Sequence, residues 1–316
     1  MITRKVFDVQ RRIVAHKTVE AWDNAPHVSI MVELDVTTLM ANLAEVSARP
    51  EYAETRVTIN SVMLKIIALG LKKSPEMNAH VQYSRLTGVG QVWLHDEINI
   101  ATPFKATCGR MIPPVIKGVE RMTLVEVCRG MDELKRRAAN THVDLLLLEA
   151  AHDDTWKRVH RGQLWAVLRR VWANYFGRDR VILPSRQVAE AYYQTPAAER
   201  ITAADLLSAT ILVSNIGSAM RDLPGCFGLL EIIQPQTVAI GLAAIQKKPL
   251  VLTDAAGQEA IAIRQVLRMT ICFDHRAMDF EAITGFIREV TRLCREGLAP
   301  EPRAMAETVV TPSLAL

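Results

Sequence analysis

A histidine near the C-terminus lies between two acidic residues, in the run Asp274-His275-Arg276 with Asp279 four positions after the histidine. An apolar segment ends here and an amphipathic segment begins just after Asp279. Imidazole groups titrate near neutral pH, so a histidine exposed at such a boundary can act as a general base, and a nearby carboxylate can help to fix its ring. The same pattern also fits Asp279 as a helix N-cap and His275 as a structural residue, so the motif alone leaves the chemistry open.

Two elements must position this motif, one on each side of it. Residues 261–273 are rich in β-branched and apolar side chains, which predicts a strand that ends just before His275. Residues 280–296 repeat apolar side chains every three or four positions, which predicts a helix that Gly297 terminates. The histidine is therefore expected at the junction of a strand and a loop.

Other segments are expected to complete a layered domain. Residues 204–214 predict a strand leading into Asn215-Ile-Gly217, and the apolar run 238–245 predicts a buried strand. Residues 28–35 alternate as a half-buried strand does, and further helices are expected at residues 11–25, 58–73 and 123–139. The mixture indicates an α/β or α+β fold.

The composition excludes several classes of protein. The 316 residues are 49% hydrophobic and carry a net charge of +4, so a sizeable core is expected and no strong nucleic-acid footprint. The five cysteines form no CxxC pair, which favours reduced thiols over a disulfide or zinc framework. We find no glycine-rich nucleotide motif, metal-ligand spacing, signal peptide or membrane-spanning run, so we expect a soluble cytoplasmic protein without a metal.

The segment 142–200 differs in character from the rest of the chain. It holds Trp156, Trp165 and Trp172, and its apolar side chains fit one helical face flanked by Lys157, Arg158, Arg161, Arg169 and Arg170. We favour a helix packed on its own domain or across an oligomer interface, because one apolar face is ordinary for a helix of a globular protein. A membrane-surface anchor or a partner-binding helix is the less favoured alternative.

Several separated motifs together resemble one family, the catalytic domain of dihydrolipoamide acyltransferases of 2-oxoacid dehydrogenase complexes, related in fold to chloramphenicol acetyltransferase. The motifs run in the family's order over most of the chain: Arg11-Arg-Ile-Val-Ala15, Trp22-x-x-x-Pro26-His27, Pro75-Glu-Met-Asn-Ala79, Ile98-Asn-Ile-Ala-Thr-Pro103, Thr210-Ile-Leu-Val-Ser-Asn-Ile-Gly217 and Asp274-His-Arg-Ala-Met-Asp279. The resemblance implies a mixed sheet flanked by helices, in a two-layer α/β (α+β) arrangement with a helical insertion at about 142–200. We expect residues 1–316 to form one catalytic domain with a flexible tail at 301–316.

The reaction that the resemblance implies is acyl transfer between coenzyme A and a second thiol such as dihydrolipoamide, or another acceptor. His275 would be the general base, and Ser214 would donate its hydroxyl to the tetrahedral oxyanion. In the family, the site lies between two subunits of a trimer, so His275 and Ser214 are expected to come from neighbouring subunits. A homotrimer or larger oligomer is implied.

Five other residues take lesser roles by the same resemblance. Asp279 would hold the site together electrostatically, in an ion pair with Arg11 from the first helix. Asn215 and Gly217 would shape the turn after Ser214, and His27 would line the substrate channel. Coenzyme A would enter as a substrate, and the acceptor would be a separate lipoyl protein or another 2-oxoacid dehydrogenase component.

The sequence also departs from the family's pattern. Phe280 stands where the motif continues with glycine, and its ring could narrow the channel, select another acyl group, block one substrate or point into the core. The match begins near residue 5, so we expect no lipoyl domain before it and no covalently attached lipoate. These departures leave open an alternative, a catalytically inactive core or scaffold of a 2-oxoacid dehydrogenase-like assembly.

Overall fold

The chain is described here by a computed structural model, which places residues 2–4, 6–106, 108–160, 164–176, 180, 183–223 and 225–297. The expected tail at 301–316 lies outside the described residues.

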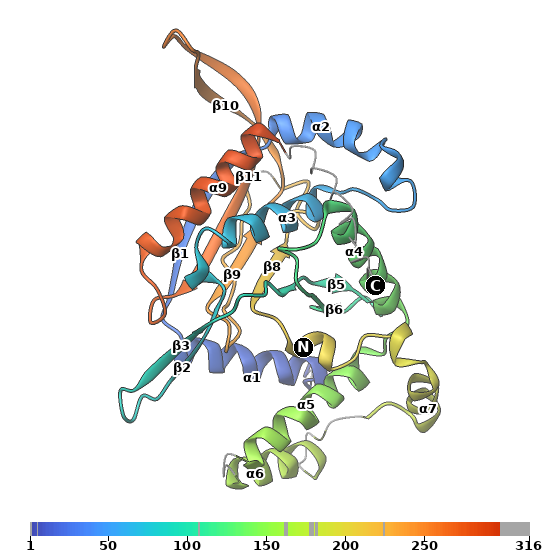
Figure 1. Cartoon of the computed structure of the whole chain (residues 1–316). Coiled ribbons are helices and arrows are strands. Elements are labelled where there is room, and N and C mark those ends of the chain that lie inside the picture. The colour runs from blue at the N-terminus through green and yellow to red at the C-terminus, as the bar shows by residue number, and fades with distance from the viewer. Residues whose placement is uncertain are drawn as a thin grey trace, which may run out of the picture.

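A seven-stranded mixed sheet forms the centre of the described residues (Figure 1). Along the sheet the order is β1-β11-β9-β8-β4-β7, and β10 pairs with the far part of β11. Strands β8 and β9 are parallel, whereas β11 is antiparallel to both β1 and β9. The strands of this sheet are β1 (His27–Asp35), β4 (Ile100–Ala101), β7 (Val115–Ile116), β8 (Ile211–Asn215), β9 (Val238–Leu242), β10 (Gln246–Thr253) and β11 (Glu259–Asp274).

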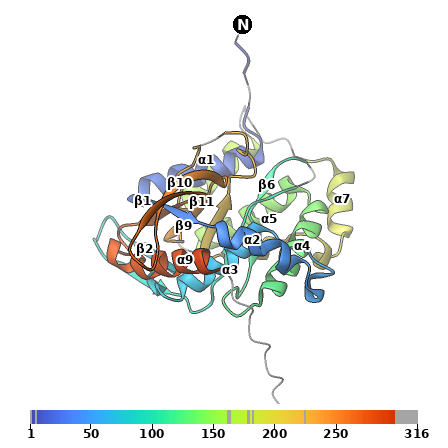
Figure 2. The ribbon, with the colours of Figure 1, turned by 90° about the horizontal axis from the view of Figure 1, so that it is seen from above.

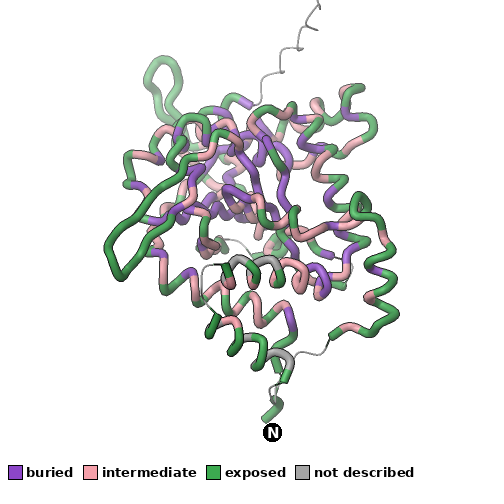
Figure 3. The backbone as a smooth tube through the Cα atoms, turned by 60° about the horizontal axis from the view of Figure 1, so that its bottom comes forward, coloured by how far each residue is buried: buried purple, intermediate pink, exposed green. Residues whose placement is uncertain are grey.

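Two small hairpins accompany this sheet. They are β2 (Ala79–Tyr83) with β3 (Gly90–Leu94), and β5 (Phe104–Lys105) with β6 (Met111–Ile112). The β2–β3 hairpin and the β10–β11 hairpin both project from the body of the molecule (Figure 1). The exposed and buried stretches of the backbone show the same division, with the buried ones gathered at the centre (Figure 3).

Helices cover both faces of the sheet, with α1 on one face and α3 and α9 on the other (Figures 1 and 2). The helices are α1 (Val9–Asn24), α2 (Thr37–Ser47), α3 (Ile59–Leu71), α4 (Leu124–Ala139), α5 (Val143–His160), α6 (Leu164–Tyr175), α7 (Arg186–Gln194), α8 (Ala204–Leu207) and α9 (Thr284–Glu296). Short 3₁₀ turns are η1 (Pro50–Tyr52), η2 (Pro75–Met77), η3 (Ala197–Glu199) and η4 (Phe280–Ile283). The expected mixed α/β sheet flanked by helices is confirmed.

The main core lies between the sheet and the α3–α9 layer. Alternate residues of β11 point to this side, and Ile271 and Phe273 are fully buried there. They share one cluster with Ile67 of α3 and Phe286 of α9. Because successive strand residues face opposite sides, Thr270 and Cys272 point to the α1 side.

Two expectations about local structure are wrong. Residues 204–207 form helix α8 rather than the start of a strand, and strand β8 begins only at Ile211. The carboxylate of Asp205 accepts hydrogen bonds from the backbone and the hydroxyl of Thr202, and such bonds favour a helical turn. In the insertion, packing of the apolar face of α6 on its own domain is also wrong, since Trp165 is 79% exposed and Trp172 is 67% exposed in one chain, whereas packing across an oligomer interface stays a prediction.

Candidate active site

His275 lies directly after β11, the central long strand of the sheet. The backbone N–H of His275 donates to Pro26 O at 3.2 Å, and that of Asp274 donates to Thr237 O at 2.9 Å. These bonds hold the turn after β11 to two neighbouring segments. The position of the histidine is therefore set by the sheet and by the segments that flank it.

The two residues next to His275 in the sequence, Asp274 and Arg276, form a buried ion pair. Asp274 is fully buried, and the Arg276 guanidinium donates to its carboxylate through Nε at 3.0 Å and through a terminal nitrogen at 2.5 Å. The Arg276 backbone N–H also donates to the Asp274 carboxylate, and the guanidinium lies 5.5 Å from the centre of the Tyr83 ring. Both residues belong to the Asp274-His275-Arg276 motif of the sequence, but no role was predicted for Asp274 or Arg276. The signal was present as an aspartate at the end of a predicted strand, because an aspartate carboxylate can accept from the backbone N–H two residues later in a turn.

The imidazole ring of His275 is held through one nitrogen. Nδ1 lies 3.1 Å from Met278 O and 3.3 Å from an oxygen of Asp279, and both are acceptors, so Nδ1 carries the proton in the neutral ring. Among the described residues, Nε2 has no hydrogen-bond partner, and the side chain is 40% exposed. The ring therefore presents an unprotonated Nε2 on a partly exposed side chain, where it can accept a proton.

Asp279 lies at the outer edge of this arrangement. Its side chain is 86% exposed, so solvent screens its charge strongly, and its contact with Nδ1 helps to orient the ring. Arg11 lies in the first turn of α1, which Gln10 ties to Met111 O at 3.0 Å. The fourteen residues from Arg11 to the end of α1 at Asn24 span about 20 Å, and the chain lies beside His275 only after that, at Pro26. Arg11 and Asp279 therefore do not meet within one chain, and an ion pair between them stays a prediction for contacts between subunits.

Phe280 packs beside the histidine. Its ring centre lies 6.0 Å from that of His275 and 5.4 Å from that of Phe273, both in edge-on geometry. The residue is 49% exposed, so it does not point into the core. The ring forms one wall next to the imidazole, at the position where the family motif has glycine.

His27 is held on both sides of its ring by the backbone, and its expected position at a substrate channel stays a prediction. Its Nδ1–H donates to Ala25 O at 2.7 Å, its Nε2 accepts from Ile232 N–H at 3.0 Å, and its ring stacks on Trp22 at 5.0 Å. Both ring nitrogens are occupied by backbone partners, which leaves neither for a substrate. No pattern close to His27 in the sequence indicated the partner at Ile232.

Ser214 and its turn lie at the carboxyl end of β8. Ser214 pairs with Gly241 of β9, and the backbone N–H groups of Ile216 and Gly217 both donate to Leu242 O. A Cβ on Gly217 would lie 2.5 Å from the backbone of Ala243, so only glycine fits this close approach. The turn is thereby fixed against β9.

Asn215 follows the serine with its amide half-buried. Its Nδ2 donates to Asn60 Oδ1 at 3.5 Å, and its buried Oδ1 has no hydrogen-bond partner among the described residues. Asn60 lies in the first turn of α3, so the serine turn is placed close to the start of that helix.

One chain does not bring Ser214 and His275 together. Ser214 is in register with Gly241 and, through it, with Thr270 of β11, and His275 lies five residues further along that strand. Five residues of strand and two strand spacings separate them by about 20 Å. Groups that act on one tetrahedral centre lie within about 3 Å of the reacting atoms.

The described residues also contain no group of three or more His, Cys, Asp or Glu placed to hold a metal ion, and no helix among them is long and apolar enough to span a membrane.

The family model for 2-oxoacid dehydrogenases acyltransferase (catalytic domain) matches residues 2–146 and 185–298. The unmatched stretch, 147–184, contains the second part of α5 and all of α6. Among curated proteins, the dihydrolipoyllysine-residue acetyltransferase component of the pyruvate dehydrogenase complex of Staphylococcus aureus is 22% identical over 291 residues, which are 92% of this chain and 51% of that protein. The chain spans about half the length, or less, of the curated relatives that it matches.

Two solved structures share the fold. A probable dihydrolipoamide acetyltransferase from Listeria monocytogenes has a TM-score of 0.64 at 18% identity, over 95% of this chain and 97% of that one. The cubic core of the pyruvate dehydrogenase multienzyme complex has a TM-score of 0.62 at 17% identity, over 93% and 91%.

Proposed function

Because the chain belongs to the 2-oxoacid dehydrogenase acyltransferase (catalytic domain) family, we propose that it transfers an acyl group between coenzyme A and a dihydrolipoyl-like thiol. The observation that carries the proposal is the His275 ring, whose Nδ1 is held by two acceptors while Nε2 is open. That arrangement suits a base that must take one proton and return it.

His275 supplies the proton transfer. A thiol has a pKa of about 8.5 and is mostly protonated at neutral pH, so it needs a base to become the nucleophile. Nε2 takes the thiol proton as the sulfur attacks the thioester carbonyl, and a tetrahedral oxyanion forms. When the intermediate collapses, the carbon–sulfur bond to the departing thiol breaks, and that thiolate receives the proton back from His275.

Ser214 stabilises the oxyanion from a neighbouring subunit. Its separation of about 20 Å from His275 in one chain supports a site shared between copies, because the two groups must meet at one carbonyl. Asn215 and Gly217 shape the turn that presents the serine hydroxyl. The functional unit is a homotrimer or a larger closed oligomer built from it.

The acceptor thiol belongs to a separate lipoyl-bearing protein or domain, and another 2-oxoacid dehydrogenase component delivers the acyl group to it. The names of the similar proteins support this, since they are components or cores of the pyruvate dehydrogenase complex.

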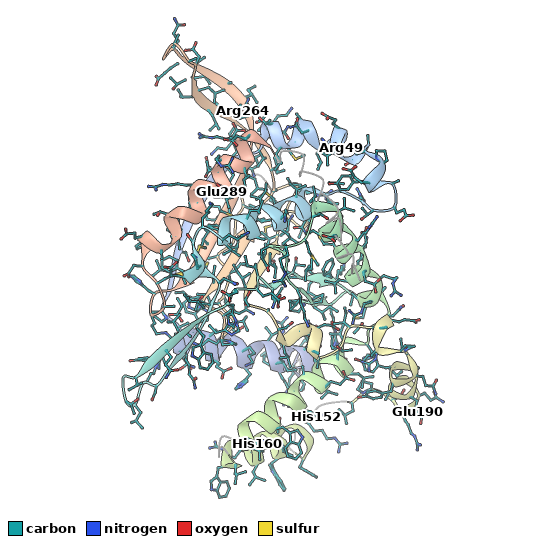
Figure 4. The ribbon with its side chains drawn as sticks, in the orientation of Figure 1. Arg49, His152, His160, Glu190, Arg264 and Glu289 are labelled. Atoms are coloured by element: carbon teal, nitrogen blue, oxygen red, sulfur yellow. The ribbon has the colours of Figure 1, made fainter. Side chains whose placement is uncertain are left out.

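The first test measures acyl transfer from acetyl-CoA to free dihydrolipoamide. We expect His275→Ala to lower kcat by about 10²–10⁴ and Ser214→Ala by about 10²–10³. His152→Ala is the matched control, because this exposed histidine lies on the projecting part of α5 (Figure 4). Unchanged activity in His275→Ala would remove His275 from the mechanism. Failure of the intact oligomer to bind CoA by calorimetry would favour the inactive scaffold instead.

A second test asks whether the site is shared. Subunits carrying only His275→Ala are dissociated and reassembled in equal amounts with subunits carrying only Ser214→Ala. In a closed trimer each mixed ring has one intact His–Ser junction of three, so random mixing restores about one quarter of the wild-type activity. Sites contained within one chain would give no recovery.

A further inference from the structure

Helix α5 divides into an anchored half and a projecting half. Leu145 and Leu146 near its start are buried, and Arg110 forms an ion pair with Asp144. Glu149 lies 3.4 Å from the Arg200 guanidinium, which ties that turn to the segment after α7. Beyond this point the helix leaves the body, and α6 lies at the outermost end of the projection (Figures 1 and 4).

The projection presents apolar side chains to solvent. On α6 they recur at one-, three- and four-residue intervals, so they share one face of the helix. The exposed members of this face, together with the residue that follows α6, are Leu164, Trp165, Leu168, Val171, Trp172 and Phe176. Trp156 on α5 is also exposed, and the rings of Trp172 and Phe176 lie 5.3 Å apart. We call this set the aromatic face.

The sequence around the aromatic face is strongly basic. Residues 155–180 contain seven Lys or Arg and one Asp, a net charge of +6, whereas the whole chain carries +4. All other residues together therefore carry a net charge of −2. The whole stretch that the family model leaves unmatched, 147–184, carries a net charge of +3, because it also contains Glu149, Asp153 and Asp154.

We propose that the aromatic face docks the protein on a lipid surface with anionic headgroups. Tryptophan and phenylalanine on one face of a short helix, with arginine beside them, are the pattern of helices that lie in the plane of a membrane interface. Tryptophan is suited to that boundary because its ring is apolar and its N–H is polar. Each arginine near an anionic surface adds about fivefold to the partition coefficient.

A second copy of this chain fits the face less well. Two aromatic faces brought together by a two-fold axis would also bring together two copies of α6, on which Arg169 is exposed, and like charges at a contact oppose association. Helix α6 lies at the outer end of the projecting part of the molecule (Figure 1), and the apolar side chains of the aromatic face are exposed there. The role is separate from acyl transfer, because it uses no residue of the proposed active site.

Flotation of the full-length protein with vesicles tests the proposal. One set of vesicles is pure phosphatidylcholine and the other contains about 30 mol % phosphatidylglycerol. We expect binding to the second set and not to the first, with release in about 0.5 M NaCl. Trp165→Ala/Trp172→Ala lowers the partition coefficient at least about tenfold, and Arg169→Glu lowers it by about twentyfold.

Two control variants carry the same kinds of substitution on the β2–β3 hairpin. Trp93→Ala removes an exposed tryptophan of the β2–β3 hairpin, and Arg85→Glu reverses an exposed charge of that hairpin. Both controls should float as the wild type does, and all variants should keep wild-type transfer to free dihydrolipoamide. Absence of binding to anionic vesicles overturns the proposal, as does equal binding by Trp165→Ala/Trp172→Ala. The proposal is also overturned if the wild type binds no vesicles and the Trp165→Ala/Trp172→Ala variant forms a smaller oligomer, because the aromatic face would then contact another copy of the chain.

Discussion

Removing the Arg276 side chain should destabilise the end of β11 and the histidine with it. The guanidinium is 17% exposed, and it is the only side-chain cation bonded to the fully buried Asp274 carboxylate among the described residues. Taking away one partner of a buried pair leaves an uncompensated charge and costs about 3–5 kcal/mol. The backbone N–H of Arg276 still bonds the carboxylate in Arg276→Met, so we expect about 3 kcal/mol.

The loss can be measured as a shift in the thermal midpoint at fixed protein concentration. At about 2.1 cal/mol/K of unfolding entropy per residue, about 3 kcal/mol in a chain of 316 residues corresponds to about 4–5 °C. The same change at Arg292→Met, in an exposed ion pair on α9, is the matched control and should leave the midpoint close to that of the wild type. We also expect kcat to fall in Arg276→Met, because His275 lies between the two members of the pair.

A double-mutant cycle separates the buried charge from the pair itself. Asp274→Leu/Arg276→Met replaces both charges with apolar side chains, and its midpoint should recover most of the loss. If Arg276→Met loses no more stability than Arg292→Met, the buried pair does not hold the strand end and the reasoning is refuted.

Three further changes test other parts of the structure. Gly217→Ala should cost about 1–3 kcal/mol and reduce kcat, since its Cβ meets the backbone of Ala243; a wild-type urea midpoint would contradict this. Burial lowers the pKa of His80, so the unfolded chain binds the proton more readily, and stability falls as the pH drops from about 6.5 toward the folded pKa. The urea midpoint should therefore differ between pH 7.5 and 5.5, about one unit to either side of that value, and this difference should shrink in His80→Gln. An equal difference in the variant would show that His80 is not the source of the pH dependence. Phe280→Gly should raise kcat/KM for longer acyl groups over acetyl by roughly tenfold, and an unchanged ratio would show that the ring does not limit acyl size.

The sequence predicts those features whose causes are local. The apolar run of β11 indicates both the strand and its end before His275, because burial on both faces leaves a continuous apolar signal. The start of α3 is likewise visible locally, since the sequence offers Thr58 or Asn60 as its cap, and Thr58 forms a capping box with Ser61. The family itself follows from several motifs in order, which no single motif could show.

Features that depend on distant partners escape the sequence. The ring of His27 is held partly by Ile232, 205 positions away, and nothing near either residue indicates the meeting. The distance between Arg11 and His275 is set by the direction of α1, whose first turn lies near Met111 and whose last turn leads to Pro26 beside His275. The exposed face of α6 escapes for a different reason, since an apolar helical stripe has the same spacing whether it meets a core, a partner or a lipid surface.

The length of β11 has a consequence for how the active site is kept in order. Its sixteen residues run from an exposed arm, where Ile261 and Ile263 face solvent, to the turn that carries His275. Side chains alternate along a strand, so a slip of one residue against β1 or β9 would turn the imidazole to the opposite side of the sheet and bring Asp274 into its position. Correct pairing along β11 is therefore a requirement for the proposed role of His275, and the same slip would also move the buried apolar side chains of this strand to the wrong face.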